Sequence, residues 1–267
     1  MKALKSKMKN KIAYKQIEVQ KHIGYYSFTP KKVKDVLVLI HGISRNAEEL
    51  VNVFSEYAEK QGVALIAPVF SKEYASDYQR LGRRGKGPRS DYQLLSILKD
   101  YKNAYQLEFQ RFHLFGYSAG AQYAHRFAFG YPNLVNTVSL AAAGWYSLPT
   151  TTLPFPRGTR LRKQLPGILF EPNRYLRTKF RVFIGKEDNK RDVALNTNPK
   201  IDLTQGRNRI QRAQNWIDLM QLAMHKRSIN NSIELKLLKS AGHDFMQCVE
   251  NGCLHELVLE WIKEVNK

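Results

Sequence analysis

A serine stands between two glycines at residues 116–120, Gly-Tyr-Ser-Ala-Gly, where an apolar run gives way to a run with helical spacing. The pattern G-x-S-x-G between a strand and a helix is typical of a strained turn that lifts a serine hydroxyl clear of a sheet. The amides at the start of the following helix favour negative charge developing at the same place. We interpret Ser118 as a nucleophile. The alternative is a glycine-bounded turn with a solvated serine.

A serine hydroxyl is a weak nucleophile until a base removes its proton. Of the seven histidines in the chain, only His41 and His243 follow predicted strands at the edge where the serine is expected. We favour His243 because its loop, Lys-Ser-Ala-Gly-His-Asp-Phe, contains a glycine and offers reach and freedom. The alternative is a loop histidine that is hydrogen-bonded to the backbone.

The base in turn needs a carboxylate to orient it. Three acids follow a predicted strand: Glu187, Asp188 and Asp192. Gly185 marks the turn and Asp188 lies three residues beyond it, so we favour Asp188; Asp192 and then Glu187 remain alternatives, and any of them can instead be a solvated loop acid. Arg191 and Arg209, beside this loop, are candidates to hold it in place.

An acyl-transfer site also needs donors for the oxyanion of the tetrahedral intermediate. A His-Gly turn at residues 41–42 ends an early strand, so the backbone N–H of Ile43 can aim at the serine. The N–H of Ala119, directly after the nucleophile, supplies a second donor. Losing one such donor typically costs about 3 kcal/mol of transition-state stabilisation. His41 is then structural rather than a base.

Alternating strands and helices are predicted to position these groups. The predicted strands are 35–42, 63–70, 109–118, 134–145, 179–188 and 232–243, and the predicted helices are 46–62, 91–106, 119–132, 208–228 and 253–265. Asn46 with Glu49 indicates the start of the first helix, and Gly62 its end. The alternation predicts an α/β fold, with a mostly parallel sheet and helices on both faces. Residues 15–30 are expected to add an antiparallel hairpin at one edge.

A segment rich in Pro and Arg, residues 146–178, interrupts the alternation. It is too long for an ordinary connection, which predicts a lid-like or substrate-binding insertion. We expect a single domain over residues 1–267. Ligands of such sheets bind beyond the carboxyl ends of the strands.

The composition, with 43% hydrophobic and 25% charged residues, is that of a chain that buries a core. A formal charge of +20 is compatible with an acidic ligand, a nucleic acid or an anionic membrane surface. We favour a generally basic proteome, because the charge is spread along the chain. No nucleic-acid partner is expected, since no helix-turn-helix, zinc-ligand spacing or RNP-like strand is present.

Two cysteines, Cys248 and Cys253, are too few for a disulfide framework. We interpret them as idle thiols rather than as a local bridge or a weak metal site, and we expect no metal or organic cofactor. Residues 1–16 are basic but lack the apolar region of a secretory signal. No apolar run approaches the roughly 20 residues that span a bilayer. We therefore expect a cytoplasmic protein.

Several stretches together resemble the α/β-hydrolase superfamily over nearly the whole chain: HGISRNAEEL, YQRLG, FGYSAGAQYAHRFA, AAGWYSLP, GKEDNKRD and QGRNRIQRA. They look most like uncharacterised hydrolases grouped with poly(3-hydroxybutyrate) depolymerases and feruloyl-type esterases. The chain order Ser118, Asp188, His243 is the order expected for α/β-hydrolases. The resemblance implies the α/β-hydrolase fold, a triad of these three residues and ester-type hydrolysis. It does not imply the polymer as substrate.

The loop after the second parallel strand and the insertion are both rich in Arg and Lys. Arg83 and Arg84 in that loop suggest a substrate with an anionic group, since a guanidinium suits carboxylate or phosphate; we favour the alternative of a solvated basic loop. Trp145 and Tyr146 follow a strand end and either line the substrate pocket or pack in the core. Tyr117, beside the nucleophile, is a further candidate to contact substrate.

The sequence thus predicts a serine hydrolase that cleaves a small-molecule carboxylic ester through an acyl-enzyme. One alternative is a catalytically inactive basic scaffold that binds nucleic acid or an anionic surface. Another is an acyltransferase that uses the same triad. Thioesters and amides remain open as substrates.

Overall fold

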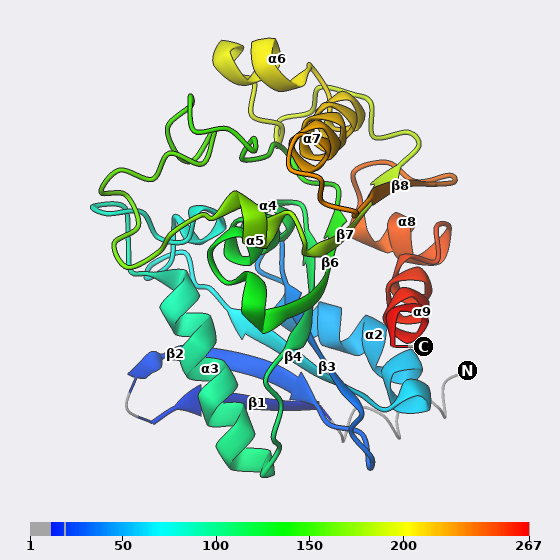
Figure 1. The fold of residues 1–267 in the computed structure, drawn as a ribbon. Coiled ribbons are helices and arrows are strands. Elements are labelled where there is room, and N and C mark those ends of the chain that lie inside the picture. The colour runs from blue at the N-terminus through cyan, green and yellow to red at the C-terminus, as the bar shows by residue number, and fades with distance from the viewer. Residues whose placement is uncertain (1–11, 19, 267) are drawn as a thin grey trace.

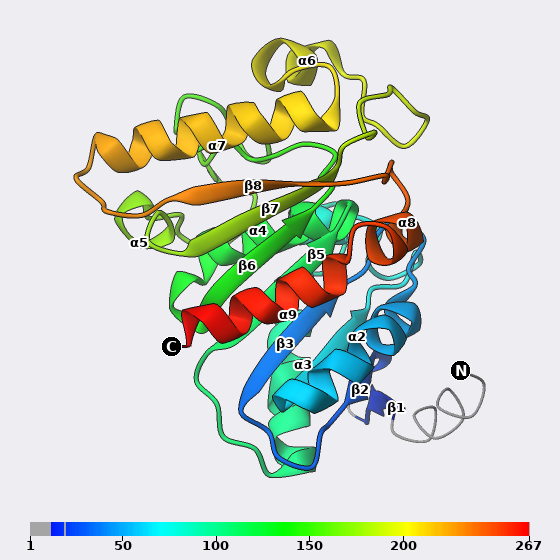
Figure 2. The same cartoon turned by 90° about the vertical axis from the view of Figure 1, so that its right-hand side faces the viewer.

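The architecture is an eight-stranded sheet between two layers of helices (Figures 1 and 2). It was derived from a computed structural model that describes residues 12–18 and 20–266. The strands are β1 (Ile12–Ile17), β2 (Gln20–Phe28), β3 (Asp35–Ile40), β4 (Val63–Val69), β5 (Phe112–Tyr117), β6 (Val135–Ala141), β7 (Lys179–Gly185) and β8 (Ile233–Leu238). They lie in the order β1-β2-β4-β3-β5-β6-β7-β8. The expectation about residues 1–16 cannot be followed here, since residues 1–11 lie outside the described range.

The sheet is mostly parallel, as the alternating pattern predicts. All neighbours from β4 to β8 pair in parallel. β1 and β2 form the predicted antiparallel hairpin at one edge, and β2 pairs antiparallel with β4. The described residues contain no helix that is long and apolar enough to cross a membrane.

The helices divide between the two faces of the sheet. The longer ones are α2 (Ala47–Gln61), α3 (Ser90–Tyr105), α4 (Ala119–Gly130), α7 (Arg209–His225) and α9 (Leu254–Val265), and the short ones are α5 (Pro172–Tyr175), α6 (Pro199–Gln205) and α8 (Phe245–Glu250). α3, α4 and α7 pack into one hydrophobic cluster and α2, α8 and α9 into another. Figure 2 shows α2 and α9 in front of the sheet and α7 above β8.

Strand β3 illustrates why the central strands are continuously apolar. Val36, Val38 and Ile40 enter the cluster of α3, α4 and α7, whereas Leu37 and Leu39 enter the cluster on the opposite face. Successive side chains of a strand point to opposite faces, and both faces of this sheet are covered. Burying each such side chain contributes about 1.5–3 kcal/mol.

The start of α2 differs from the sequence prediction in one detail. Asn46 occupies the N-cap position, but its side chain accepts no capping hydrogen bond and instead donates to Glu49 Oε2 at 3.0 Å. Gly62 ends the helix in the left-handed region, φ 74°, as predicted. The hydrogen bond from Asn46 holds the Glu49 carboxylate near the end of the sheet where β3 stops.

The insertion of residues 146–178 lies against α4 rather than over the turn at Ser118. The Phe129 ring of α4 stacks on Tyr175 with centroids 4.2 Å apart, and a Cβ at Gly130 would touch Ile168. This cover explains why α4 is buried on every side. A cis peptide bond precedes Pro156 within the insertion.

Candidate active site

Ser118 lies in a sharp turn between β5 and α4. Its backbone has φ 54° and ψ −112°, a conformation that residues other than glycine seldom adopt. The flanking glycines have steric reasons: a Cβ on Gly116 would come within 2.2 Å of the Gly120 carbonyl oxygen, and a Cβ on Gly120 within 2.0 Å of the Ile40 carbonyl oxygen. The turn is therefore packed directly against the end of β3, and the Ser118 N–H is held by the Ala141 carbonyl at 2.7 Å.

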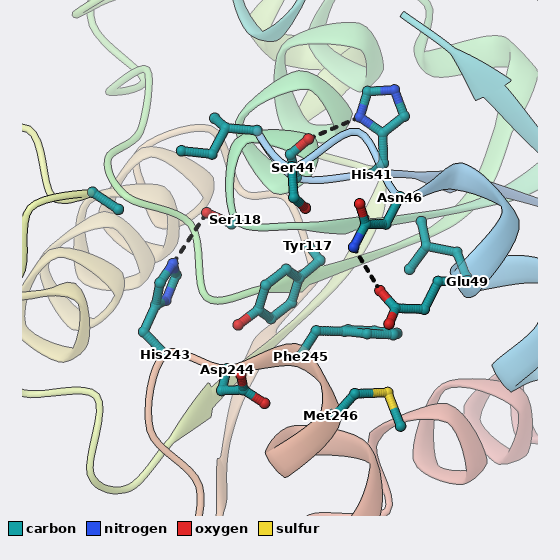
Figure 3. Close-up of a pocket in the computed structure, with 14 residues that line it drawn as sticks. His41, Ser44, Asn46, Glu49, Tyr117, Ser118, His243, Asp244, Phe245 and Met246 are labelled. Atoms are coloured by element: carbon teal, nitrogen blue, oxygen red, sulfur yellow. Dashed lines mark hydrogen bonds between the residues drawn. The ribbon is translucent and has the colours of Figure 1, made fainter.

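His243 faces this serine from the loop between β8 and α8. Its Nε2 lies 3.2 Å from Ser118 Oγ, a contact drawn as a dashed line in Figure 3. The loop is shaped by the Gln247 side chain, whose Oε1 accepts from the Gly242 N–H, and by Asp244, which caps α8. The imidazole is stacked at 20° on the ring of Tyr117, with centroids 5.7 Å apart. These contacts hold the imidazole next to the serine.

Asp188 completes the array from the turn after β7. Its Oδ2 lies 2.9 Å from His243 Nδ1, and its side chain is 1% exposed. The turn is tied to the end of β8, because the Lys186 N–H donates to the Leu238 carbonyl and the Glu187 N–H to the Ala241 carbonyl. Since a carboxylate accepts, Nδ1 carries the imidazole proton, and Nε2 is free to accept the serine proton.

Arg209, at the start of α7, binds the acid from behind. Its guanidinium is 1% exposed and donates to Asp188 Oδ1 at 3.0 Å and to both oxygens of Asp192, at 2.5 and 3.0 Å. The hydrogen bonds from Arg209 lower the pKa of Asp192 to about 2. Asp192 is thus paired with Arg209, and Glu187 is exposed. Of the three acids that the sequence offers, only Asp188 contacts the histidine.

Two backbone donors flank the serine. Gly42 lies beside it, since a Cβ on Gly42 would be 3.7 Å from Ser118 Cβ. Ile43 follows in the same loop, and Ala119 is the first residue of α4. In the part of the chain that the structure describes, no group accepts a hydrogen bond from the N–H of Ile43 or Ala119. Both remain available to a ligand.

His41 is structural, in agreement with the sequence argument. It is buried, its Nδ1 lies 2.9 Å from the Gly42 carbonyl oxygen, and its Nε2 accepts from the Phe70 N–H at 3.1 Å. These partners require the neutral imidazole with its proton on Nδ1. Burial lowers the pKa of His41 to about 4.

A cavity of about 340 Å³ opens beside Ser118 and His243. Its walls are residues that follow the carboxyl ends of β3, β5, β7 and β8: His41, Gly42, Ile43, Ser44, Asn46, Glu49, Leu50, Tyr117, Ser118, Ala194, His243, Asp244, Phe245 and Met246. Tyr117 is thus in the wall, as the sequence suggests. Ile43 and the His41-Gly42 turn were also singled out from the sequence, whereas Ser44, Leu50, Ala194, Phe245 and Met246 were not, although their place near strand ends is a signal that could have found them.

Four residues that the sequence offers as tentative substrate contacts, Trp145, Tyr146, Arg83 and Arg84, do not line this cavity. Tyr146 is fully buried and stacks on Trp216. Trp145 is 3% exposed, with the guanidinium of Arg126 4.3 Å from its ring centroid. Arg83 donates to Asp77 at 2.9 Å, and Arg84 is exposed on the surface. The arginine-based prediction of an anionic substrate therefore has no support at the cavity.

No metal site accompanies this array. Within residues 12–18 and 20–266, no three His, Cys, Asp or Glu side chains are grouped so that they could hold a metal ion. Cys248 is buried and Cys253 exposed, and both are free thiols. Burial raises the pKa of Cys248 to about 12.

No protein-family model matches the chain, and no curated protein does. Solved structures do. A poly(aspartic acid) hydrolase-1 from Sphingomonas sp. KT-1 is 20% identical, with a TM-score of 0.75 over 88% of this chain and 93% of that one. LpqC, a poly(3-hydroxybutyrate) depolymerase from Bordetella parapertussis, is 23% identical, with a TM-score of 0.73 over 91% of this chain and 86% of that one. FphF, a fluorophosphonate-binding serine hydrolase from Staphylococcus aureus, is 15% identical, with a TM-score of 0.59 over 96% and 98%.

Proposed function

Starting from the α/β-hydrolase fold that this chain has, we propose that it is a serine hydrolase that cleaves carboxylic esters through an acyl-enzyme. The observation that carries the proposal is the continuous chain of contacts from Ser118 Oγ through His243 to the buried carboxyl of Asp188. The similar structures include proteins described as hydrolases and a fluorophosphonate-binding serine hydrolase, which supports the same reaction class.

In the proposed reaction, His243 Nε2 takes the proton of Ser118 as Oγ attacks the ester carbonyl carbon. The imidazolium that forms is stabilised by Asp188, whose Oδ2 already faces Nδ1. The negative charge on the former carbonyl oxygen is met by the N–H groups of Ile43 and Ala119. His243 then gives its proton to the leaving alcohol, and Ser118 keeps the acyl group.

The second half repeats these steps with water. His243 takes a proton from a water molecule as that water attacks the acyl carbon, and then returns the proton to Ser118 Oγ as the acid leaves. An acceptor other than water would make the same site an acyltransferase. Product analysis in the presence of an added alcohol separates these two outcomes.

A panel of p-nitrophenyl esters and short peptides, with the native chain and Ser118→Ala, tests the proposal. We expect ester cleavage that falls at least about 10³-fold in Ser118→Ala. A matched control is Ser232→Ala, since Ser232 is exposed and does not line the cavity. Equal rates for the native chain and Ser118→Ala, or cleavage of peptides alone, would contradict the proposal.

A further inference from the structure

The charged side chains in the wall of the cavity beside Ser118 are acidic. Glu49 and Asp244 are among its lining residues, and no Lys or Arg is. This is unusual in a chain with a formal charge of +20. In Figure 3, Glu49 and His243 lie on opposite sides of the cavity, with Tyr117 and Phe245 between them.

The nearest basic residues are turned away from the cavity. Arg45 follows Ser44 in the wall, but its guanidinium donates to the Ser71 carbonyl and lies 4.6 Å from the Tyr78 ring centroid. Arg209 is enclosed behind Asp188 and Asp192. The two lining carboxylates are therefore not neutralised by an arginine within the wall.

Both carboxylates retain free acceptor capacity. Glu49 uses Oε2 to accept from Asn46, and Asp244 uses Oδ1 to accept from the Gln247 N–H. Among the described residues, no hydrogen bond is made to Glu49 Oε1 or Asp244 Oδ2. Each side chain is also held in place by the bond that it makes, so a ligand would meet oxygens that are already oriented.

Tyr117 gives an independent indication of a ligand. Its side chain is more than nine-tenths buried, yet its hydroxyl has no hydrogen-bond partner among the described residues. Figure 3 shows this hydroxyl on the side of the cavity occupied by His243 and Asp244. A buried hydroxyl without a partner is costly, and this one can donate its proton to a polar ligand or accept through its oxygen lone pairs. The ring of Phe245 stands edge-on to Tyr117, with centroids 5.3 Å apart, and lines the same cavity.

We infer that the cavity selects esters that carry an ammonium group, with Glu49 and Asp244 as the specificity-determining residues. The inference rests on the proposed ester hydrolysis and adds its substrate class. Carboxylates attract the positive charge, and aromatic rings such as Phe245 bind ammonium groups through their faces. Anionic esters are disfavoured, because their charge is repelled by both carboxylates.

A set of three acetates of similar size tests the inference. Acetylcholine carries a quaternary ammonium, 3,3-dimethylbutyl acetate is its neutral isostere, and 3-sulfopropyl acetate is anionic. We expect kcat/KM for acetylcholine to exceed that for the neutral ester by about sixteenfold at low salt, with about fourfold from each carboxylate. The preference should shrink as ionic strength rises.

The variants Glu49→Gln and Asp244→Asn remove charge while keeping the bond to Asn46 and the cap of α8. Each should lower the ratio of cationic to neutral kcat/KM by about fourfold. Glu48→Gln is the matched control, because Glu48 is exposed on the same helix and does not line the cavity. A ratio near one in the native chain, or a ratio that the two variants leave unchanged, would overturn the inference.

Binding separates this inference from the proposed function. Calorimetric titration of Ser118→Ala with butyltrimethylammonium and with butanesulfonate needs no catalysis. Binding of the cation alone, lost in Glu49→Gln/Asp244→Asn, supports the cation site even when no ester is cleaved. Cleavage of neutral esters without binding of the cation refutes the cation site and leaves the hydrolase proposal standing.

Discussion

Replacing Arg209 tests whether the acid of the proposed triad is positioned from behind. Arg209→Met keeps an unbranched apolar stem but removes the donor to Asp188 Oδ1 and both donors to Asp192. One hydrogen bond to a charged group contributes about 1.5–3 kcal/mol. If that energy orients Asp188 toward His243, kcat/KM for p-nitrophenyl acetate should fall about tenfold to hundredfold, since 1.4 kcal/mol corresponds to a factor of ten.

The same change should lower the free energy of unfolding. Breaking a buried ion pair by removing one partner costs about 3–5 kcal/mol, because the remaining charge stays buried and unpaired. Urea titration measures this loss. Arg209→Lys, which keeps the charge but not the fork that spans Asp188 and Asp192, is expected to fall between the native chain and Arg209→Met in both measurements.

A double-mutant cycle separates positioning from general destabilisation. In an Asp188→Asn background, Arg209→Met should have little further effect on kcat/KM, since the group through which Arg209 acts is already altered. Both variants must be compared at a temperature where each is folded. A loss of kcat/KM that is equally large in both backgrounds, or a native rate in Arg209→Met, would refute the positioning role.

Three other outcomes follow from the packing and the buried histidine. Gly120→Ala should lower the free energy of unfolding by about 2 kcal/mol or more, because the new Cβ meets the Ile40 carbonyl oxygen. Gly144→Ala should be tolerated, because its Cβ meets only a side-chain nitrogen at 3.2 Å. Equal urea midpoints for the two variants would contradict this. Burial holds the folded-state pKa of His41 near 4, below its ordinary 6.5, so the unfolded chain takes up the proton first as the pH falls. The free energy of unfolding should therefore fall by roughly 3 kcal/mol between pH 6.5 and 4. Urea midpoints unchanged over that window would disprove this. Tyr146→Phe removes a buried hydroxyl without a partner among the described residues, so it should leave KM and the melting temperature unchanged or raise the latter; a higher KM would return Tyr146 to the substrate site.

The alternation of apolar and amphipathic runs was enough to predict the central strands and long helices. The strand at 35–40 and the helix at 47–61 lie within two residues of the predicted bounds. The short helices α5, α6 and α8 were not predicted, because four to seven residues carry too little periodicity. The role of the glycines around Ser118 could be predicted from the sequence, because it depends on the turn itself. Neighbouring backbone comes so close to both glycines that no Cβ fits.

The contacts to the substrate were harder to predict, since they depend on how loops lie across the ends of strands. Trp145 and Arg83 follow strand ends as expected, but their partners, Arg126 and Asp77, hold them away from the cavity. Glu49 was interpreted only as part of a helix start, and its place in the cavity wall follows from the tertiary position of α2. The loop arginines Arg83 and Arg84 raised the possibility of an anionic substrate, whereas the charged residues Glu49 and Asp244 in the cavity wall are acidic.

Labelling with a fluorophosphonate probe tests the central claim most directly. The reaction requires an activated serine hydroxyl, so we expect one phosphonyl group per chain, located on Ser118 by mass spectrometry of the digested protein. Ser118→Ala should not be labelled, and His243→Ala should be labelled far more slowly, because the base is missing. An unlabelled native protein, or a label that stays at another residue in Ser118→Ala, would contradict the account.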